Sequence, residues 1–117
     1  MKLKRIYNDY IPFDGYLAMV FYPWVFIRNS VCQKYTPTVN RHEVTHALQQ
    51  LETLWVFFIL IYVLEYLIKL IYSGFNFYQA YHSISFEQEA FANQGKVDYN
   101  KNRKFYAWAK YIFTMKK

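Results

Sequence analysis

The chain has 117 residues and a formal net charge of +6, and 23% of its residues are aromatic. This length fits a single domain over residues 1–117, and the one cysteine, Cys32, excludes a disulfide framework. The basic residues are spread along the chain and form no recognised nucleic-acid-binding motif, so we expect no nucleic-acid partner. Positive charge combined with many tyrosines favours contact with an anionic membrane surface.

The N-terminal quarter predicts a small β element. Residues 6–11 read as an extended segment, and the sequence Pro-Phe-Asp-Gly at residues 12–15 predicts a turn. The apolar stretch over residues 16–28 is interrupted by Pro23, which favours two short strands over a helix. Polar residues interrupt any apolar signal-peptide core near the start, so we expect a protein on the cytoplasmic side, associated with the membrane or integral to it.

A metal-binding pattern opens the first long helix. His42, Glu43 and His46 form the sequence H-E-x-x-H, and helix positions four apart share one face. Two imidazoles at this spacing can bind one zinc ion (Zn²⁺), and Glu43 can take a proton from a metal-activated water. This pattern is typical of zincin metallopeptidases. The alternative is a solvated helix start, because Asn40 and Glu43 also have the spacing of a capping pair.

Glu65 is the first candidate for a third ligand. On a straight helix it would lie about 28 Å from His46, because each residue adds 1.5 Å. Only a turn near Glu52–Thr53 would bring it back to the histidines. Otherwise Glu65 is expected to pair with Lys69, which lies one helical turn further on.

A second helix is predicted over residues 85–93, after the breaking pair Ser73-Gly74 and a polar loop. Ser85 and Gln88 have the spacing of a capping box at its start. Glu87 and Glu89 lie on different faces of this helix, so only one of them can point at the histidines.

The segment from Glu89 to Asn93 resembles the E-x-x-(small)-D helix of gluzincins, with Asn in place of the usual Asp. In gluzincins the Glu is the third zinc ligand, and the Asp orients a ligand histidine. The resemblance therefore implies this site: His42, His46 and Glu89 as zinc ligands, Glu43 as the base, and Asn93 as the residue that orients a histidine. A second register makes Glu87 the ligand, but it leaves Phe91 at the orienting position, so Glu89 is preferred.

The helical pattern that begins at residue 42 continues to about residue 72, with a bend allowed near Glu52–Thr53. Residues 53–64 are apolar on all sides, and continuing through Glu65 and Lys69 reaches the length of a membrane span. We expect residues 53–72 to insert into a membrane or to embed in its surface. The alternative is a core helix that the other helices surround. A final basic amphipathic helix is predicted from Tyr99 to about Lys116.

Together these features predict a mainly α (α+β) fold: zincin-like helices, a small N-terminal β element and a C-terminal amphipathic helix. The expected function is a membrane-associated zinc metallopeptidase that cleaves a peptide or protein substrate, with His82 or Tyr81 as a donor to the oxyanion. The alternative is a non-catalytic membrane-surface or scaffold protein whose zinc site is structural or vestigial. A zincin-like protein that binds a partner without hydrolysis is a third reading.

Overall fold

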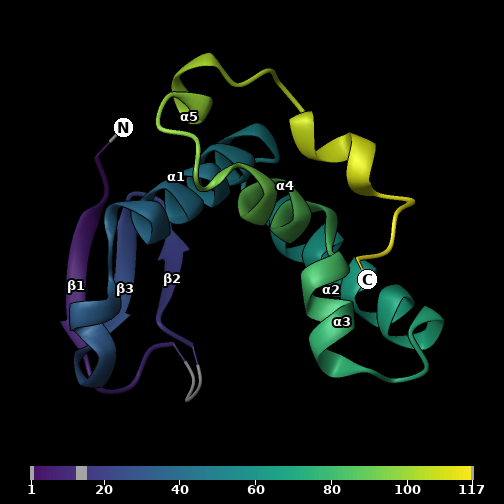
Figure 1. The fold of residues 1–117 in the computed structure, drawn as a ribbon, viewed down its shortest axis with the longest axis horizontal. Coiled ribbons are helices and arrows are strands. Elements are labelled where there is room, and N and C mark those ends of the chain that lie inside the picture. The colour runs from purple at the N-terminus through teal and green to yellow at the C-terminus, as the bar shows by residue number, and fades with distance from the viewer. Residues whose placement is uncertain (1, 13–15, 117) are drawn as a thin grey trace.

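The computed structural model describes residues 2–12 and 16–116, and it is mainly helical with one small sheet (Figure 1). The sheet contains β1 (Lys4–Asn8), β2 (Ala18–Phe21) and β3 (Trp24–Arg28) in the order β1-β3-β2. β3 pairs with β1 in parallel and with β2 in antiparallel orientation. The predicted strand pair around Pro23 is therefore confirmed, whereas the central residues of the predicted turn, 13–15, lie outside the described residues.

Helix α1 (Pro37–Glu52) lies along β2, after the short 3-10 helix η1 (Asn29–Lys34). The Gln50 side chain fixes this contact, because it donates to Val20 O and accepts from Tyr22 N, each at 2.8 Å. The helix begins five residues before His42, and Thr36 caps it by accepting from Val39 N at 3.3 Å. The capping role considered for Asn40 and Glu43 is therefore wrong.

The long helix bends sharply between α1 and α2 (Val56–Tyr72), whose axes differ by 113°. Leu54 and Trp55 adopt positive φ angles of 55° and 64°, and Val56 N donates to Leu54 O at 2.6 Å. These features make a tight γ-turn at Trp55, although neither residue is a glycine. The bend that the sequence allowed near Glu52–Thr53 is thus present. Among the described residues no helix alone has the length and hydropathy of a membrane span, and only the bent pair of α1 and α2 together meets that test.

Two short helices follow where a polar loop and one helix were expected. They are α3 (Phe77–Ser83) and α4 (Ser85–Asn93), and they meet at Ile84. The predicted capping box is wrong, because Ser85 donates through its backbone N (3.0 Å) and its hydroxyl to the Glu65 carboxylate on α2. Glu65 also pairs with Lys69 at 3.8 Å, as predicted. Glu65 therefore caps α4 and does not reach the histidines.

The C-terminal segment forms two short helices instead of one long amphipathic helix. They are α5 (Tyr99–Asn102) and the 3-10 helix η2 (Ala107–Tyr111). Arg103, between them, has an extended backbone and directs its side chain inward, where it is 4% exposed. The prediction failed because a basic residue assigned to the solvated face is instead buried against two carboxylates.

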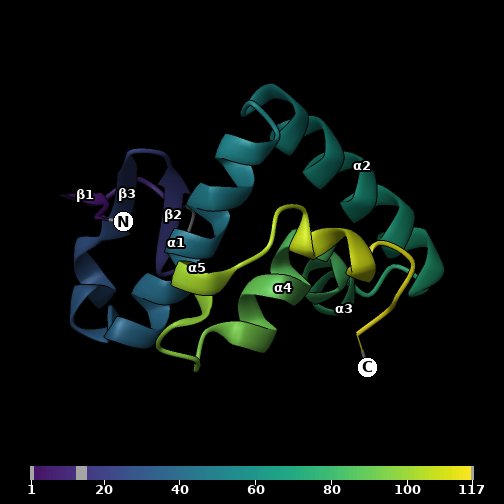
Figure 2. The same cartoon turned by 90° about the horizontal axis from the view of Figure 1, so that it is seen from above.

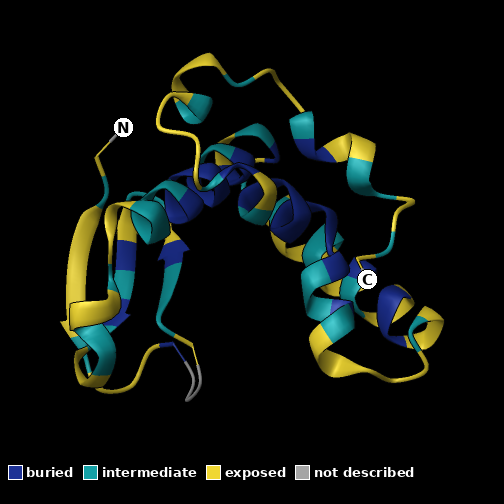
Figure 3. Ribbon diagram, in the orientation of Figure 1, coloured by how far each residue is buried: buried dark blue, intermediate teal, exposed yellow. Residues whose placement is uncertain are grey.

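The buried residues concentrate where α1 and α4 cross (Figure 3). Ile84, Phe86 and Trp108 form an apolar cluster, against which partly buried side chains of α2 pack. Figure 2 shows the sheet at one end of the molecule and α2 along its outer edge, with α4 between them. This arrangement confirms the predicted mainly α (α+β) class and brings α1, α2 and α4 together at the histidines.

Candidate metal centre

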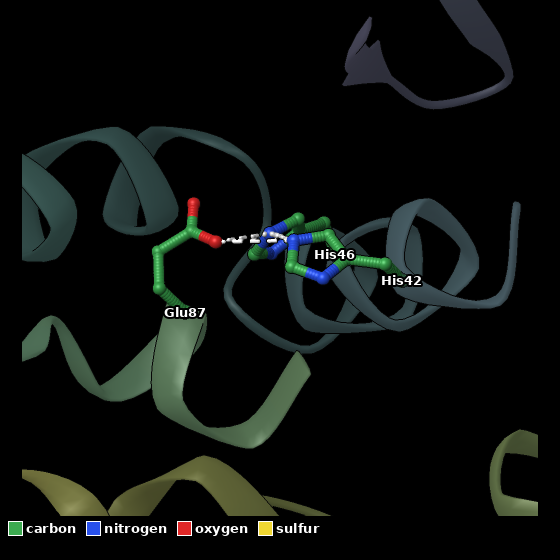
Figure 4. A group of neighbouring side chains, drawn as sticks. All are labelled: His42, His46 and Glu87. Carbon is green, nitrogen blue, oxygen red and sulfur yellow. Dashed lines mark hydrogen bonds and ion pairs between the residues drawn. The ribbon is translucent and has the colours of Figure 1, made fainter. Parts of the chain in front are cut away.

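Three buried side chains converge between α1 and α4 (Figure 4). His42 and His46 extend from adjacent turns of α1, and Glu87 reaches them from α4. The two Nε2 atoms lie 3.1 Å from each other, and each lies 3.1 Å from Glu87 Oε1. The three residues are 4–7% exposed. This buried group could hold a metal ion.

Hydrogen bonds behind the rings fix which nitrogen faces the centre. His42 Nδ1 lies 2.9 Å from Gln94 Oε1, and His46 Nδ1 lies 2.8 Å from Gln49 Oε1. An amide oxygen only accepts, so each Nδ1 carries the proton and each Nε2 presents a lone pair. With the carboxylate oxygen of Glu87, three acceptors face one point, where a metal ion or a proton on one Nε2 can balance them. This is the donor set and ring orientation that a metal site needs.

The pKa shifts of Glu87 and His46 show how the charges of the group balance. Burial alone would raise the pKa of Glu87, but the neighbouring histidines hold it well below its usual range. Burial alone would lower the pKa of His46, but Glu87 raises it to about 9. A proton on His46 therefore balances Glu87 when no other cation does. Tyr62 on α2 donates to the second oxygen, Glu87 Oε2, at 2.7 Å and fixes the carboxylate.

The preferred third ligand, Glu89, does not face the histidines. It is fully buried and accepts from Gln49 Nε2 (2.9 Å), Tyr99 Oη (2.6 Å) and Arg103 Nε (2.5 Å). Arg103 also donates to both oxygens of Glu52 at 2.9 Å. The ligand assignment is therefore corrected to Glu87, the register that the sequence ranked second. Glu89 points the other way because its counter-ion, Arg103, lies on the opposite side of α4.

The predicted orienting role of Asn93 is also wrong. Its side chain donates to Glu89 O at 2.8 Å and accepts from Lys96 at 2.9 Å, and it contacts neither histidine. Gln49 and Gln94 orient the rings instead, and neither was predicted from the sequence. Gln49 follows His46 by three residues on the same helix face, and that spacing is the signal that could have identified it. Phe91, at the orienting position of the second register, packs its ring 4.4 Å from that of His42.

Glu43 is buried beside the three converging side chains. Burial raises its pKa to about 7, and the nearby histidines oppose that shift. Within residues 2–12 and 16–116, no donor hydrogen-bonds to its carboxylate. Glu43 is thus an unpartnered carboxyl group, close to the point where the three acceptors meet, that can gain or lose a proton near neutral pH.

Tyr81 and His82 lie at the end of α3, and both rings contact Phe91, which packs on His42. Burial raises the pKa of Tyr81 above its usual range, and the charges of Glu87 and Glu43 raise it further. The hydroxyl therefore keeps its proton and remains a donor. The His82 ring packs 4.5 Å from that of Phe91, and burial lowers its pKa. Of the two predicted oxyanion donors, Tyr81 interacts with both carboxylates of the site.

The chain matches no protein-family model, no curated protein and no solved structure.

Proposed function

We propose that the protein is a zinc-dependent hydrolase of peptide bonds. The observation that carries this proposal is the convergence of His42 Nε2, His46 Nε2 and Glu87 Oε1, mutually 3.1 Å apart, beside the unpartnered Glu43. Catalytic zinc sites use three protein ligands of these types at about 2.0–2.2 Å and keep a fourth position open. Within the described part of the chain, the group of ligand atoms has three members, the number that such a site uses.

Bound zinc would supply a Lewis acid that polarises a carbonyl and acidifies water. Residues of the chain would supply the proton transfer and the hydrogen bond to the oxyanion. The Glu43 carboxylate would accept a proton from the attacking water and return it to the leaving nitrogen. The protonated Tyr81 hydroxyl donates a hydrogen bond to the developing oxyanion.

Metal content after purification tests the site itself. Wild-type protein is expected to retain about one zinc per chain, whereas His46→Ala and Glu87→Gln lose it, because each removes one of three ligands. His82→Ala is the matched control, since it changes the third histidine of the chain outside the ligand group and should keep the metal. Zinc retention by Glu87→Gln would overturn the ligand assignment.

Glu43→Gln tests the chemistry. The amide cannot take a proton from water, so this variant should keep zinc and fold but fail to cleave a mixture of internally quenched peptides that the wild type cleaves. The depth of the site favours one rival function, a structural metal that holds α1 against α4. For a structural site, the wild type and Glu43→Gln would be equally inactive on every peptide while both retain zinc.

A further inference from the structure

The outer face of α2 is apolar along its whole length. Eight of its side chains are each more than half exposed: Val56, Phe57, Leu60, Val63, Leu64, Leu67, Ile71 and Tyr72. Figure 2 shows this helix along the outer edge of the molecule, and Figure 3 colours much of it as exposed. A contiguous apolar surface of this kind on a monomer marks a site of interaction.

The charged side chains of α2 lie on its inner side. Glu65 and Lys69 are 7% and 4% exposed. Glu65 caps α4, and Lys69 Nζ donates to the carbonyl oxygens of Ser83 (2.5 Å), Thr114 (2.7 Å) and Tyr111 (3.2 Å). A surface helix of a protein surrounded by water has the opposite arrangement, with charges outward and apolar groups inward. The protein satisfies the charges of α2 internally and presents no charged side chain of this helix outward.

We propose that the outer face of α2 lies in the acyl-chain region of an anionic membrane, with the helix along the membrane surface. Two features favour lipid over a second copy of the chain. Aromatic side chains of the kind enriched at membrane interfaces flank the helix, with Trp55 before it and the exposed Tyr72 and Tyr78 at and after its end. The C-terminal segment, which Lys69 holds against α2, exposes Lys110 and Lys116 on a chain of net charge +6.

This orientation relates the metal centre to the lipid. Phe58 and Tyr62 extend from the inner side of α2, where the Phe58 ring packs 4.5 Å from that of Phe86 and Tyr62 bonds Glu87. The centre and the bilayer therefore contact opposite faces of one helix, whose diameter with side chains is about 10 Å. Membrane binding itself requires no metal, so it can be measured independently of the proposed hydrolysis.

Sedimentation with vesicles of phosphatidylcholine and phosphatidylglycerol tests the proposal. Wild-type protein should sediment with them and stay bound in high salt, because salt screens charges but does not weaken apolar burial. L60Q/L64Q should lower the partition coefficient by about tenfold for each leucine removed from hydrocarbon. V97Q is the control: it changes an exposed apolar residue, 74% exposed, that lies outside both α2 and the C-terminal segment, and it should bind like the wild type.

Three results would overturn the proposal. The first is wild-type protein that remains in the supernatant, or that salt alone releases. The second is equal binding by L60Q/L64Q and wild type. The third is a wild-type dimer in lipid-free buffer that L60Q/L64Q converts to a monomer, since a second copy would then cover the face. Far-UV circular dichroism and metal content of L60Q/L64Q should equal those of the wild type, because both leucines are exposed.

Discussion

Gln49 is held in one orientation by its neighbours. Its Nε2 donates to Glu89 Oε1 at 2.9 Å and to Phe86 O at 3.0 Å, so its Oε1 must face His46. Glu89, which the sequence predicted as a ligand, therefore acts on the centre indirectly, through Gln49. Glu89 fixes the orientation of the Gln49 amide, and the amide oxygen fixes the tautomer of His46.

Glu89→Gln is expected to weaken zinc binding by about 10- to 100-fold, the usual cost of losing a partner behind a metal ligand. A glutamine at position 89 can donate as well as accept, so it no longer forces the orientation of Gln49. Competition with a chromophoric chelator measures the affinity. Glu52→Gln is the matched control, because Glu52 also pairs with Arg103 but does not contact Gln49. Equal losses in both variants would attribute the effect to Arg103 and contradict the role of Gln49.

The metal-free protein should lose stability as pH rises from 6.5 to 9. The pKa of His46 is raised in the folded chain from 6.5 to about 9, so its contribution is complete below pH 6.5 and disappears as the pH passes 9. The loss should be on the order of 2 kcal/mol in the free energy of unfolding. Thermal unfolding in EDTA across this range measures it. Zinc should reduce the dependence, because bound His46 is neutral throughout, and a flat profile without metal would contradict the His46–Glu87 pair.

The histidine pair of the site could be predicted from the sequence, but its third ligand could not. Spacing within one helix fixes His42 and His46, because the geometry of α1 is local. The choice between Glu87 and Glu89 depends on Arg103, which is distant in the sequence and whose burial no local pattern signals. The Glu89 carboxylate points toward Arg103, its counter-ion. Arg103 lies on a segment that the sequence predicted to be a solvated helix.

At the scale of elements, local patterns succeeded wherever a breaker marked a boundary. Pro23 separates β2 from β3, and the pair Ser73-Gly74 follows the end of α2 at Tyr72. The break between α1 and α2 carries no such marker, since Leu54 and Trp55 enter the left-handed region without a glycine. Tertiary contacts hold the chain in this break between α1 and α2. Glu52, the last residue of α1, is bound by Arg103 and accepts from Tyr106 N at 2.7 Å.

Leu54→Gly should leave stability unchanged or raise it by up to about 1 kcal/mol. Glycine removes the side-chain cost of a left-handed backbone, which is about 1–2 kcal/mol, and the added freedom of the unfolded chain offsets part of this gain. Leu54 is 72% exposed, so the change removes little packing. Urea unfolding measures it. The control, Leu60→Gly within α2, should instead lose about 1 kcal/mol. A loss of that size at Leu54 would mean that its side chain holds the turn.

At the scale of the whole molecule, the sequence predicted the class and approximate order of elements but not how the C-terminal segment is used. Residues 99–116 were expected to form one amphipathic helix over the core. They instead bring Tyr99 and Arg103 into the polar network behind the centre and Trp108 into the apolar cluster. Periodicity cannot reveal such contacts, because the network joins residues about fifty positions apart.

The group of His42, His46 and Glu87 joins two helices that are far apart along the chain, since Glu87 follows His46 by 41 positions. An unfolded chain does not hold these three side chains together, so an ion bound there binds the native state alone. Binding and folding are then one linked equilibrium, and free metal acts as a ligand of the folded form. A free concentration one hundred times the dissociation constant adds about 2.7 kcal/mol to the stability of the native state. Metal supply would thus set how much of this small domain is folded.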